Sequence, residues 1–129
     1  MGTLLVLSVV MTDCLETPNL SHFSVDDYDS IYEPAEDSFL LLDALEEDIH
    51  VLKKLKPTIC LEIGCGSGVV STCLSKYFGS SCHVMASDVN PYACEATLKT
   101  ASCNKTQVSF WIFLNCFTLK ISLQSLLWK

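Results

Sequence analysis

A glycine-rich segment flanked by carboxylates is the part of this sequence whose residues could do chemistry. Glu62 stands two positions before Gly64, and Gly66 and Gly68 follow. Asp88 lies 20 residues after Gly68. Glycine lets a ligand approach the backbone where a side chain would block it, and a carboxylate can accept hydrogen bonds from ribose hydroxyls. The spacing therefore predicts a site for a nucleotide-like ligand.

The elements around these residues must place them at one edge of a sheet. Residues 58–63 and 83–87 are rich in strand formers, and residues 69–78 and 91–101 are expected to form helices. This alternation predicts an α/β fold with a parallel sheet and right-handed crossovers. We expect the first strand to be buried, and a third strand could occupy residues 108–114.

A further helix is expected before the first strand, because apolar residues recur there at helical spacing. These residues are Leu41, Leu45, Ile49 and Leu52. The helix begins near Pro34 and ends before Pro57, which cannot continue it. Residues 12–34 are polar and lack clear periodicity, so we expect a poorly ordered acidic leader over residues 1–30.

The loop spacing separates two classes of ligand. Dinucleotide sites favour G-x-G-x-x-G, whereas Val69 here follows a G-x-G-x-G segment. The carboxylate of Glu62 suits a cationic group better than a pyrophosphate. The pattern favours S-adenosylmethionine over a nicotinamide cofactor, and a purely structural glycine turn is the remaining interpretation.

The charge of the chain is unevenly distributed. The 129 residues carry a formal net charge of -7, with -12 in the first 48 residues and +5 in the rest. We expect the acidic part to be solvated, and a docking surface for a basic partner is the alternative. The sequence contains no Arg, which argues against a nucleic-acid-binding surface.

The eight cysteines show neither a C-x-x-C motif nor the Cys and His pairs of a zinc site. We expect no metal site, and we expect Cys60, Cys73 and Cys94 to be reduced core thiols of a cytoplasmic or nuclear protein. The apolar start of the chain lacks the basic residues of a signal peptide. Polar residues interrupt the apolar stretch 108–128, so we expect no membrane span.

Four segments resemble the eukaryotic HemK-like glutamine methyltransferases, which methylate translation release factors. These segments are 32–46, which starts Tyr-Glu-Pro-Ala-Glu-Asp, 60–71, 87–91 and 103–105. The resemblance covers about residues 28–105. It implies the N-terminal half of a Rossmann-like class I methyltransferase, in which a doubly wound parallel sheet binds S-adenosylmethionine over residues 31–105.

The resemblance also implies roles for matching residues. Ser38 corresponds to a hydroxyl residue that reaches the cofactor, and Asp88 to the acid that binds its ribose. Glu62 and the glycines Gly64, Gly66 and Gly68 correspond to the loop around the methionine portion. The family further implies a small zinc-binding activator subunit as partner and a release factor as substrate.

The sequence departs from the family in its active-site motif. Asn-Pro-Pro-Tyr is absent from the 129 residues, and residues 106–129 form a divergent apolar tail. Asn90-Pro91-Tyr92 follows the second strand instead of the fourth, and its chemistry suits a helix start with Asn90 as N-cap. We therefore expect a truncated, catalytically incomplete chain of marginal stability, because a half sheet leaves an edge unpaired.

Three functions remain open. The first is the family reaction, methyl transfer from S-adenosylmethionine to a protein glutamine, with the amino group of nucleic-acid adenine as a rival acceptor. The second is a non-catalytic fragment that binds S-adenosylmethionine or the activator. The third is a translation product without function.

Overall fold

The computed structural model describes residues 13–112. In chain order its elements are the 3-10 helix η1 (Asp26–Asp29), α1 (Glu36–Glu47), α2 (Ile49–Leu55), β1 (Ile59–Ile63), α3 (Val69–Phe78), the 3-10 helix η2 (Gly79–Ser81), β2 (His83–Asp88), α4 (Pro91–Cys103) and β3 (Ser109–Ile112). The predicted alternation of strand and helix from residue 58 onward is confirmed, and α3 has the predicted bounds.

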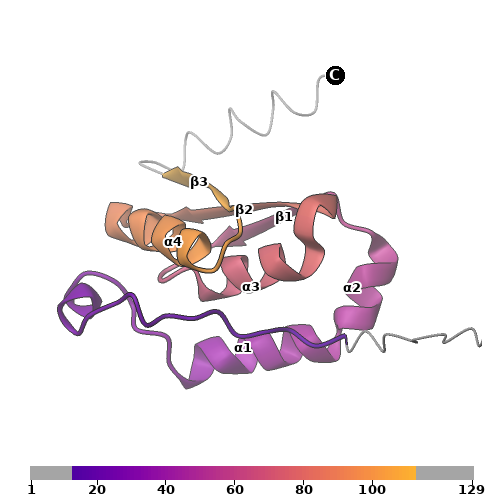
Figure 1. The fold of residues 1–129 in the computed structure, drawn as a ribbon, viewed down its shortest axis with the longest axis horizontal. Coiled ribbons are helices and arrows are strands. Elements are labelled where there is room, and N and C mark those ends of the chain that lie inside the picture. The colour runs from indigo at the N-terminus through magenta and orange to yellow at the C-terminus, as the bar shows by residue number, and fades with distance from the viewer. Residues whose placement is uncertain (1–12, 113–129) are drawn as a thin grey trace, which may run out of the picture.

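The three strands form one parallel sheet in the order β1-β2-β3. Ile59 lies opposite His83, and Met85 lies opposite both Leu61 and Ser109. The connecting helices α3 and α4 lie on the same face of this sheet (Figure 1). Parallel strands joined by helices are the arrangement expected from the sequence for part of a Rossmann-like α/β fold.

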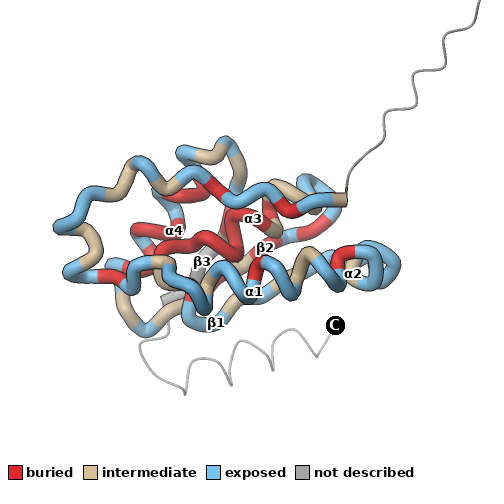
Figure 2. The backbone as a smooth tube through the Cα atoms, turned by 90° about the horizontal axis from the view of Figure 1, so that it is seen from below, coloured by how far each residue is buried: buried red, intermediate tan, exposed pale blue. Residues whose placement is uncertain are grey.

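Helices α3 and α4 form the buried middle layer. In Figure 2 they are the reddest part of the backbone, lying behind α1 and residues 13–30. Ser71, Thr72 and Cys73 of α3 are buried, as are Cys94 and Thr97 of α4. The sheet covers one side of this layer, and α1 with the N-terminal segment covers the other.

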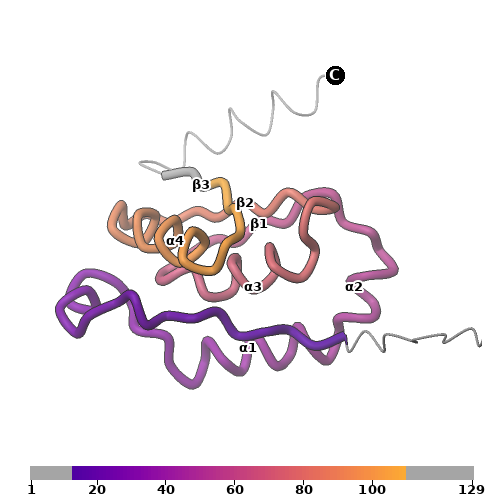
Figure 3. The backbone as a smooth tube through the Cα atoms, in the orientation of Figure 1, coloured from indigo at the N-terminus to yellow at the C-terminus, as the bar shows by residue number. Residues whose placement is uncertain are grey.

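The N-terminal segment, residues 13–30, packs along this layer beside α1 (Figure 3). Leu15 is buried against Leu42, Val70 and Cys73. The side chain of Asn104, at the end of α4, accepts from the backbone N–H of Asn19 at 2.8 Å and donates to its carbonyl at 2.9 Å. Residues 13–30 are therefore attached to the helices by specific contacts. Residues 1–12 of the predicted leader lie outside the described residues, and the domain boundaries at residues 30 and 105 stay predictions.

The helix expected between Pro34 and Pro57 is two helices, with the break at Asp48. The buried stripe also differs from the expected one, since Leu42 is buried and Leu41 is exposed. Leu42 and Ile49 point into the core that contains Leu15, and the break changes the direction of the chain between them. Helical spacing alone did not distinguish Leu41 from its neighbour.

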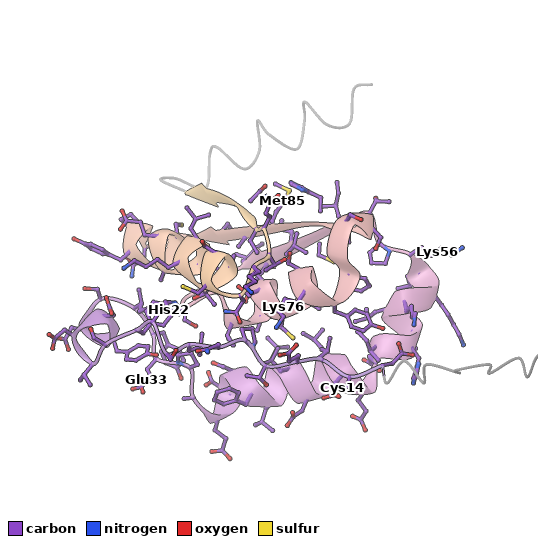
Figure 4. The ribbon with its side chains drawn as sticks, in the orientation of Figure 1. Cys14, His22, Glu33, Lys56, Lys76 and Met85 are labelled. Atoms are coloured by element: carbon purple, nitrogen blue, oxygen red, sulfur yellow. The ribbon has the colours of Figure 1, made fainter. Side chains whose placement is uncertain are left out.

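The prediction that β1 is buried is wrong for one of its faces. Ile59, Leu61 and Ile63 are exposed, while Cys60 and Glu62 between them are half-buried. The reason is that all helices of the described part lie on the other side of the sheet (Figure 1). Met85 points away from the helices on the same open face (Figure 4).

The seven cysteines within the described residues are free thiols, and Cys73 and Cys94 are buried as expected. Burial raises the pKa of Cys73 to about 11, so the thiol is protonated at neutral pH. Cys60 is only half-buried. In residues 13–112 no helix has the length and apolar character needed to cross a membrane, and most of the stretch 108–128 lies outside the described residues.

Candidate functional site

The glycine loop lies where β1 and β2 end side by side. The backbone N–H groups of Gly64 and Cys65 donate to the carbonyl of Ser87 at 2.8 and 3.1 Å, which fixes the loop to β2. Gly68 donates to the carbonyl of Cys65 at 2.7 Å and closes the turn. The loop therefore leads directly from the carboxyl end of β1 into the first turn of α3.

The three glycines of the loop all have positive φ, but their surroundings differ. Gly64, with φ 84°, has no atom within 4 Å of the place where a Cβ would lie, so this backbone faces open space. At Gly68, with φ 80°, an added Cβ would lie 2.6 Å from the Cα of Thr97. Gly64 thus leaves room for a ligand, whereas Gly68 lets α3 and α4 pack closely.

Asp88, at the end of β2, supports the same loop. One carboxylate oxygen accepts from the backbone N–H of Gly66 at 3.0 Å, and the other accepts from the N–H of Asn90 at 2.9 Å. Each carboxylate oxygen can accept a second hydrogen bond. Asp88 is therefore oriented by the backbone and still has acceptor capacity toward the cavity.

Glu62, in β1, is bound to the first turn of α3. Its Oε2 accepts from the backbone N–H of Ser71 at 3.0 Å and from the Ser71 hydroxyl. A carboxylate at a helix N-terminus satisfies a free N–H and interacts favourably with the helix dipole. Burial raises the pKa of Glu62, the two Ser71 hydrogen bonds oppose that rise, and the charge of Asp88 adds to it.

Residues before and within the first turn of α1 form another wall of the site. The Tyr32 hydroxyl donates to Asp37 at 3.0 Å, and this bond is the main reason that the pKa of Tyr32 is raised. Ser38 lies beside Asp37 and is half-buried. The wall is made by the segment that begins Tyr-Glu-Pro-Ala-Glu-Asp.

Together these elements enclose a cavity of about 290 Å³. Its lining residues are Tyr32, Asp37, Ser38, Leu41, Glu62, Gly64, Cys65, Gly66, Ser67, Val69, Val70 and Asp88. Five of the six residues predicted from the sequence are among them, and Gly68 is not. The lining contains three carboxylates and no Lys, so it favours a cationic ligand with hydroxyl donors.

Several lining residues were not assigned a role from the sequence. Tyr32 and Asp37 belong to the segment that carries the family resemblance. Their place at the start of α1 was the feature of the sequence that could have indicated them. Ser71 does not line the cavity, but it holds Glu62. Its position, three residues into the helix after the loop, fits a helix N-terminus that binds a carboxylate.

Asn90 begins α4, as expected for a helix cap. Its side-chain oxygen accepts from the backbone N–H of Tyr92 at 3.0 Å, and Pro91 is the first helical residue. Its amide nitrogen donates to the carbonyl of Ser30 at 2.7 Å. Neither Asn90 nor Tyr92 lines the cavity, which supports a structural role for this tripeptide.

A larger cavity, of about 570 Å³, lies between the N-terminal segment and α2 and α3. Its lining includes two ion pairs, Lys53 with Asp13 at 2.7 Å and Lys76 with Glu16 at 3.0 Å. None of the six predicted site residues lines it. The ion pairs fasten the N-terminal segment to the helices.

Comparison with known proteins identifies relatives over most of the chain. No protein-family model matches. Methyltransferase HEMK2 of Homo sapiens is 47% identical over 92 residues, which covers 71% of this chain and 42% of that protein, and methyltransferase HEMK2 of Mus musculus gives the same values. The eRF1 methyltransferase catalytic subunit mtq2 of Schizosaccharomyces pombe is 40% identical over 97 residues, or 70% and 42% of the two chains.

The chain spans about two fifths of the length of these curated relatives. All three relatives are named as methyltransferases. The segments that surround the cavity are the ones that resemble this family. Over the part that these relatives cover, the chain is a HemK-like methyltransferase sequence.

Proposed function

We propose that this chain binds S-adenosylmethionine in the 290 Å³ cavity at the ends of β1 and β2. The observation that carries the proposal is the lining: an open glycine backbone at Gly64 between the carboxylates of Glu62 and Asp88, with no Lys beside them. A pyrophosphate would meet three carboxylates in this cavity, whereas a sulfonium or an ammonium group would be attracted to them.

Each predicted residue then has a distinct task. Asp88 accepts hydrogen bonds from the ribose hydroxyls, since the backbone N–H groups of Gly66 and Asn90 use only some of its lone pairs. Glu62 attracts the cationic methionine end, and Ser38 contributes a hydroxyl from the opposite wall. Gly64 and Gly66 allow the backbone to approach the ligand, and Gly68 sets the packing of the helix behind it.

We further propose that the reaction served by this type of site is methyl transfer to a glutamine nitrogen of a release factor, assisted by a zinc-binding activator subunit. When bound, S-adenosylmethionine supplies a methyl group on a positively charged sulfur. Alignment of the acceptor nitrogen with that group provides the rate acceleration. The Asn-Pro-Pro-Tyr motif expected to align it is absent here, so the chain alone binds the cofactor without transferring its methyl group.

Calorimetric titration of the chain with S-adenosylmethionine tests this proposal. We expect saturable binding that Asp88→Ala weakens at least about tenfold, because a hydrogen bond to a charged group contributes about 1.5–3 kcal/mol. Asp43→Ala, which removes an exposed carboxylate from α1, is the matched control and should bind like the parent chain.

The alternatives give different results in the same experiment. Tighter binding of a nicotinamide dinucleotide than of S-adenosylmethionine would overturn the assignment of the ligand. An absence of binding to the parent chain, with far-ultraviolet circular dichroism showing it folded, would favour a purely structural glycine turn. The same preparation, supplied with activator and release factor, should transfer no methyl group.

A further inference from the structure

The glycine loop is also held from behind, by two threonines of α4 that do not line the cavity. The Thr100 hydroxyl donates to the carbonyl of Ser67 at 2.7 Å. The Thr97 hydroxyl makes a longer contact, of 3.5 Å, with the carbonyl of Gly66. Both threonines are fully buried. Two successive carbonyls of the loop therefore face α4 and not the cavity.

This orientation leaves a backbone donor of the loop for a ligand. In a trans peptide the N–H points away from the carbonyl of the preceding residue, so the N–H of Ser67 points away from α4. The N–H of Gly66 donates to Asp88. The N–H of Gly68 donates to the carbonyl of Cys65, whereas that of Ser67 makes no hydrogen bond within residues 13–112. A buried N–H without a partner costs free energy, which an acceptor atom of a ligand would recover.

The proposed ligand needs donors of this kind. The methionine part of S-adenosylmethionine carries a carboxylate as well as an ammonium group. The cavity lining has three carboxylates and no Lys, and the sequence has no Arg. An oxygen acceptor of the ligand therefore depends on hydroxyl groups and backbone N–H groups of the lining.

The N-terminal segment contacts the same Thr100 hydroxyl through His22. Figure 4 shows His22 between this segment and α4, and its Nε2 lies 3.2 Å from Thr100 Oγ1. The hydroxyl has one proton but two carbonyls within reach, because Ala96 lies 3.0 Å away. One helical turn further along α4, the side chain of Asn104 fixes the segment through its two bonds to Asn19.

The hydrogen bonds favour one tautomer of His22. Burial, followed by the charge of Lys99, lowers the pKa of His22, and Asp27 opposes this, so the ring is neutral at pH 7. Its Nδ1 is buried without a partner among the described residues. With the hydrogen on Nε2, His22 donates to Thr100, and the hydroxyl proton must go to a carbonyl. With the hydrogen on Nδ1, a buried donor would be unpaired and the Ser67 carbonyl would lose its donor to Nε2.

We propose that Thr100, oriented by His22, is a positioning residue of the cofactor site, which holds the glycine loop so that the Ser67 N–H faces the ligand. The inference rests on the proposed function, because S-adenosylmethionine is the ligand that this donor would serve. It gives the N-terminal segment a part in binding, although no residue of 13–30 lines the cavity. The path runs from His22 through Thr100 to the carbonyl of Ser67.

Calorimetric titration of the 129-residue chain with S-adenosylmethionine measures the effect on the site. Thr100→Val keeps the shape of the side chain without the hydroxyl, and it should weaken binding by about threefold to tenfold, the ratio expected for one hydrogen bond. Thr100→Ser restores the hydroxyl and should bind close to the parent chain. Thr72→Val is the matched control, because Thr72 of α3 is equally buried but its hydroxyl has no partner among residues 13–112. Binding to this variant should not change.

A double-mutant cycle tests the role of His22. His22→Leu should weaken binding less than Thr100→Val, because the hydroxyl remains but can turn toward Ala96. His22→Gln, whose amide nitrogen can take the place of Nε2, should recover the loss. The double variant His22→Leu with Thr100→Val should bind no more weakly than Thr100→Val alone, since the ring acts only through that hydroxyl. Losses of affinity that multiply would overturn this path.

Amide hydrogen exchange of the ligand-free chain tests the positioning without any ligand. Thr100→Val should speed the exchange of Gly66 and Gly68, whose N–H groups hold the loop, more than that of β2, and Thr72→Val should not. Unchanged exchange in Thr100→Val, or equal losses of affinity in Thr100→Val and Thr100→Ser, would overturn the proposal. A parent chain that binds no S-adenosylmethionine would overturn the proposed function, and the exchange rates would still decide whether α4 positions the loop.

Discussion

At the scale of single residues, the site is built from side chains that hold the backbone as much as from side chains that face a ligand. Asp88 and Glu62 each accept at least one backbone N–H, from Gly66 and from Ser71. The carboxylates are therefore fixed before any ligand arrives. Fixed acceptors lose little conformational freedom on binding, which is a source of affinity in preorganised sites.

Two glycines of the loop allow a direct test of their different roles. Gly68→Ala should lower the free energy of unfolding by at least about 2 kcal/mol, because it adds the cost of positive φ to a clash with Thr97. Gly64→Ala shares the cost of positive φ but meets no atom within 4 Å, so it should cost only about 1 kcal/mol. Urea unfolding curves measure both, and equal losses would contradict the assignment of Gly68 to packing.

The sequence predicted which residues lie around one cavity better than it predicted the contacts that each of them makes. Spacing alone placed Glu62, Gly64, Gly66 and Asp88 together, because strand ends in a parallel sheet meet at one edge. Spacing could not show that Gly68 contacts Thr97, since that contact depends on how closely α3 and α4 pack. Nor did it assign a role to Ser71, which acts through Glu62 rather than through the cavity.

At the scale of elements, the order of strands and helices was predictable, whereas the exposure of one face of β1 was not. The start of α3 follows from the glycine that precedes its first turn. The start of α4 follows from Asn90 as its cap and Pro91 as its first residue. The exposure of Ile59 and Leu61 depends on which face of the sheet the helices cover. The sequence of an apolar strand does not show whether helices cover one face of its sheet or both.

The cap of α4 should matter for stability. Asn90→Ala removes the acceptor for the Tyr92 N–H and the donor to the Ser30 carbonyl, and we expect a loss of about 1–2 kcal/mol. Asn90→Asp keeps the capping oxygen but turns the donor to Ser30 into a carboxylate oxygen that faces the same carbonyl, so it should recover only part of the loss. Thermal unfolding of the three chains measures the difference, and no effect in Asn90→Ala would exclude the cap as a stabilising feature.

At the scale of the whole molecule, the N-terminal segment is part of the folded unit. Leu15 joins a core with Leu42, Ile49 and Val69, which belong to three helices. The ion pair of Asp13 with Lys53 lies at the surface, where such pairs contribute little. Apolar burial is therefore the main contribution of this segment to stability.

Removal of the Leu15 side chain tests that conclusion. Leu15→Ala should lower the free energy of unfolding by about 2–4 kcal/mol, the range for a buried Leu. Val25→Ala in the same segment should change it by less than about 0.5 kcal/mol, because Val25 is 85% exposed. Equal effects of the two substitutions would mean that the segment is only loosely attached.

The hydrogen bonds between Asn19 and Asn104 have a consequence for the order of folding. Residues 85 positions apart make this pair of bonds, whereas β1 and β2 pair residues only 24 positions apart, as between Ile59 and His83. During synthesis the strand–helix–strand unit can close soon after its residues leave the ribosome. The N-terminal segment can pack against α1, α2 and α3 earlier, through Leu15 and its ion pairs. Its hydrogen bonds to Asn104 form only after the end of α4 has been made.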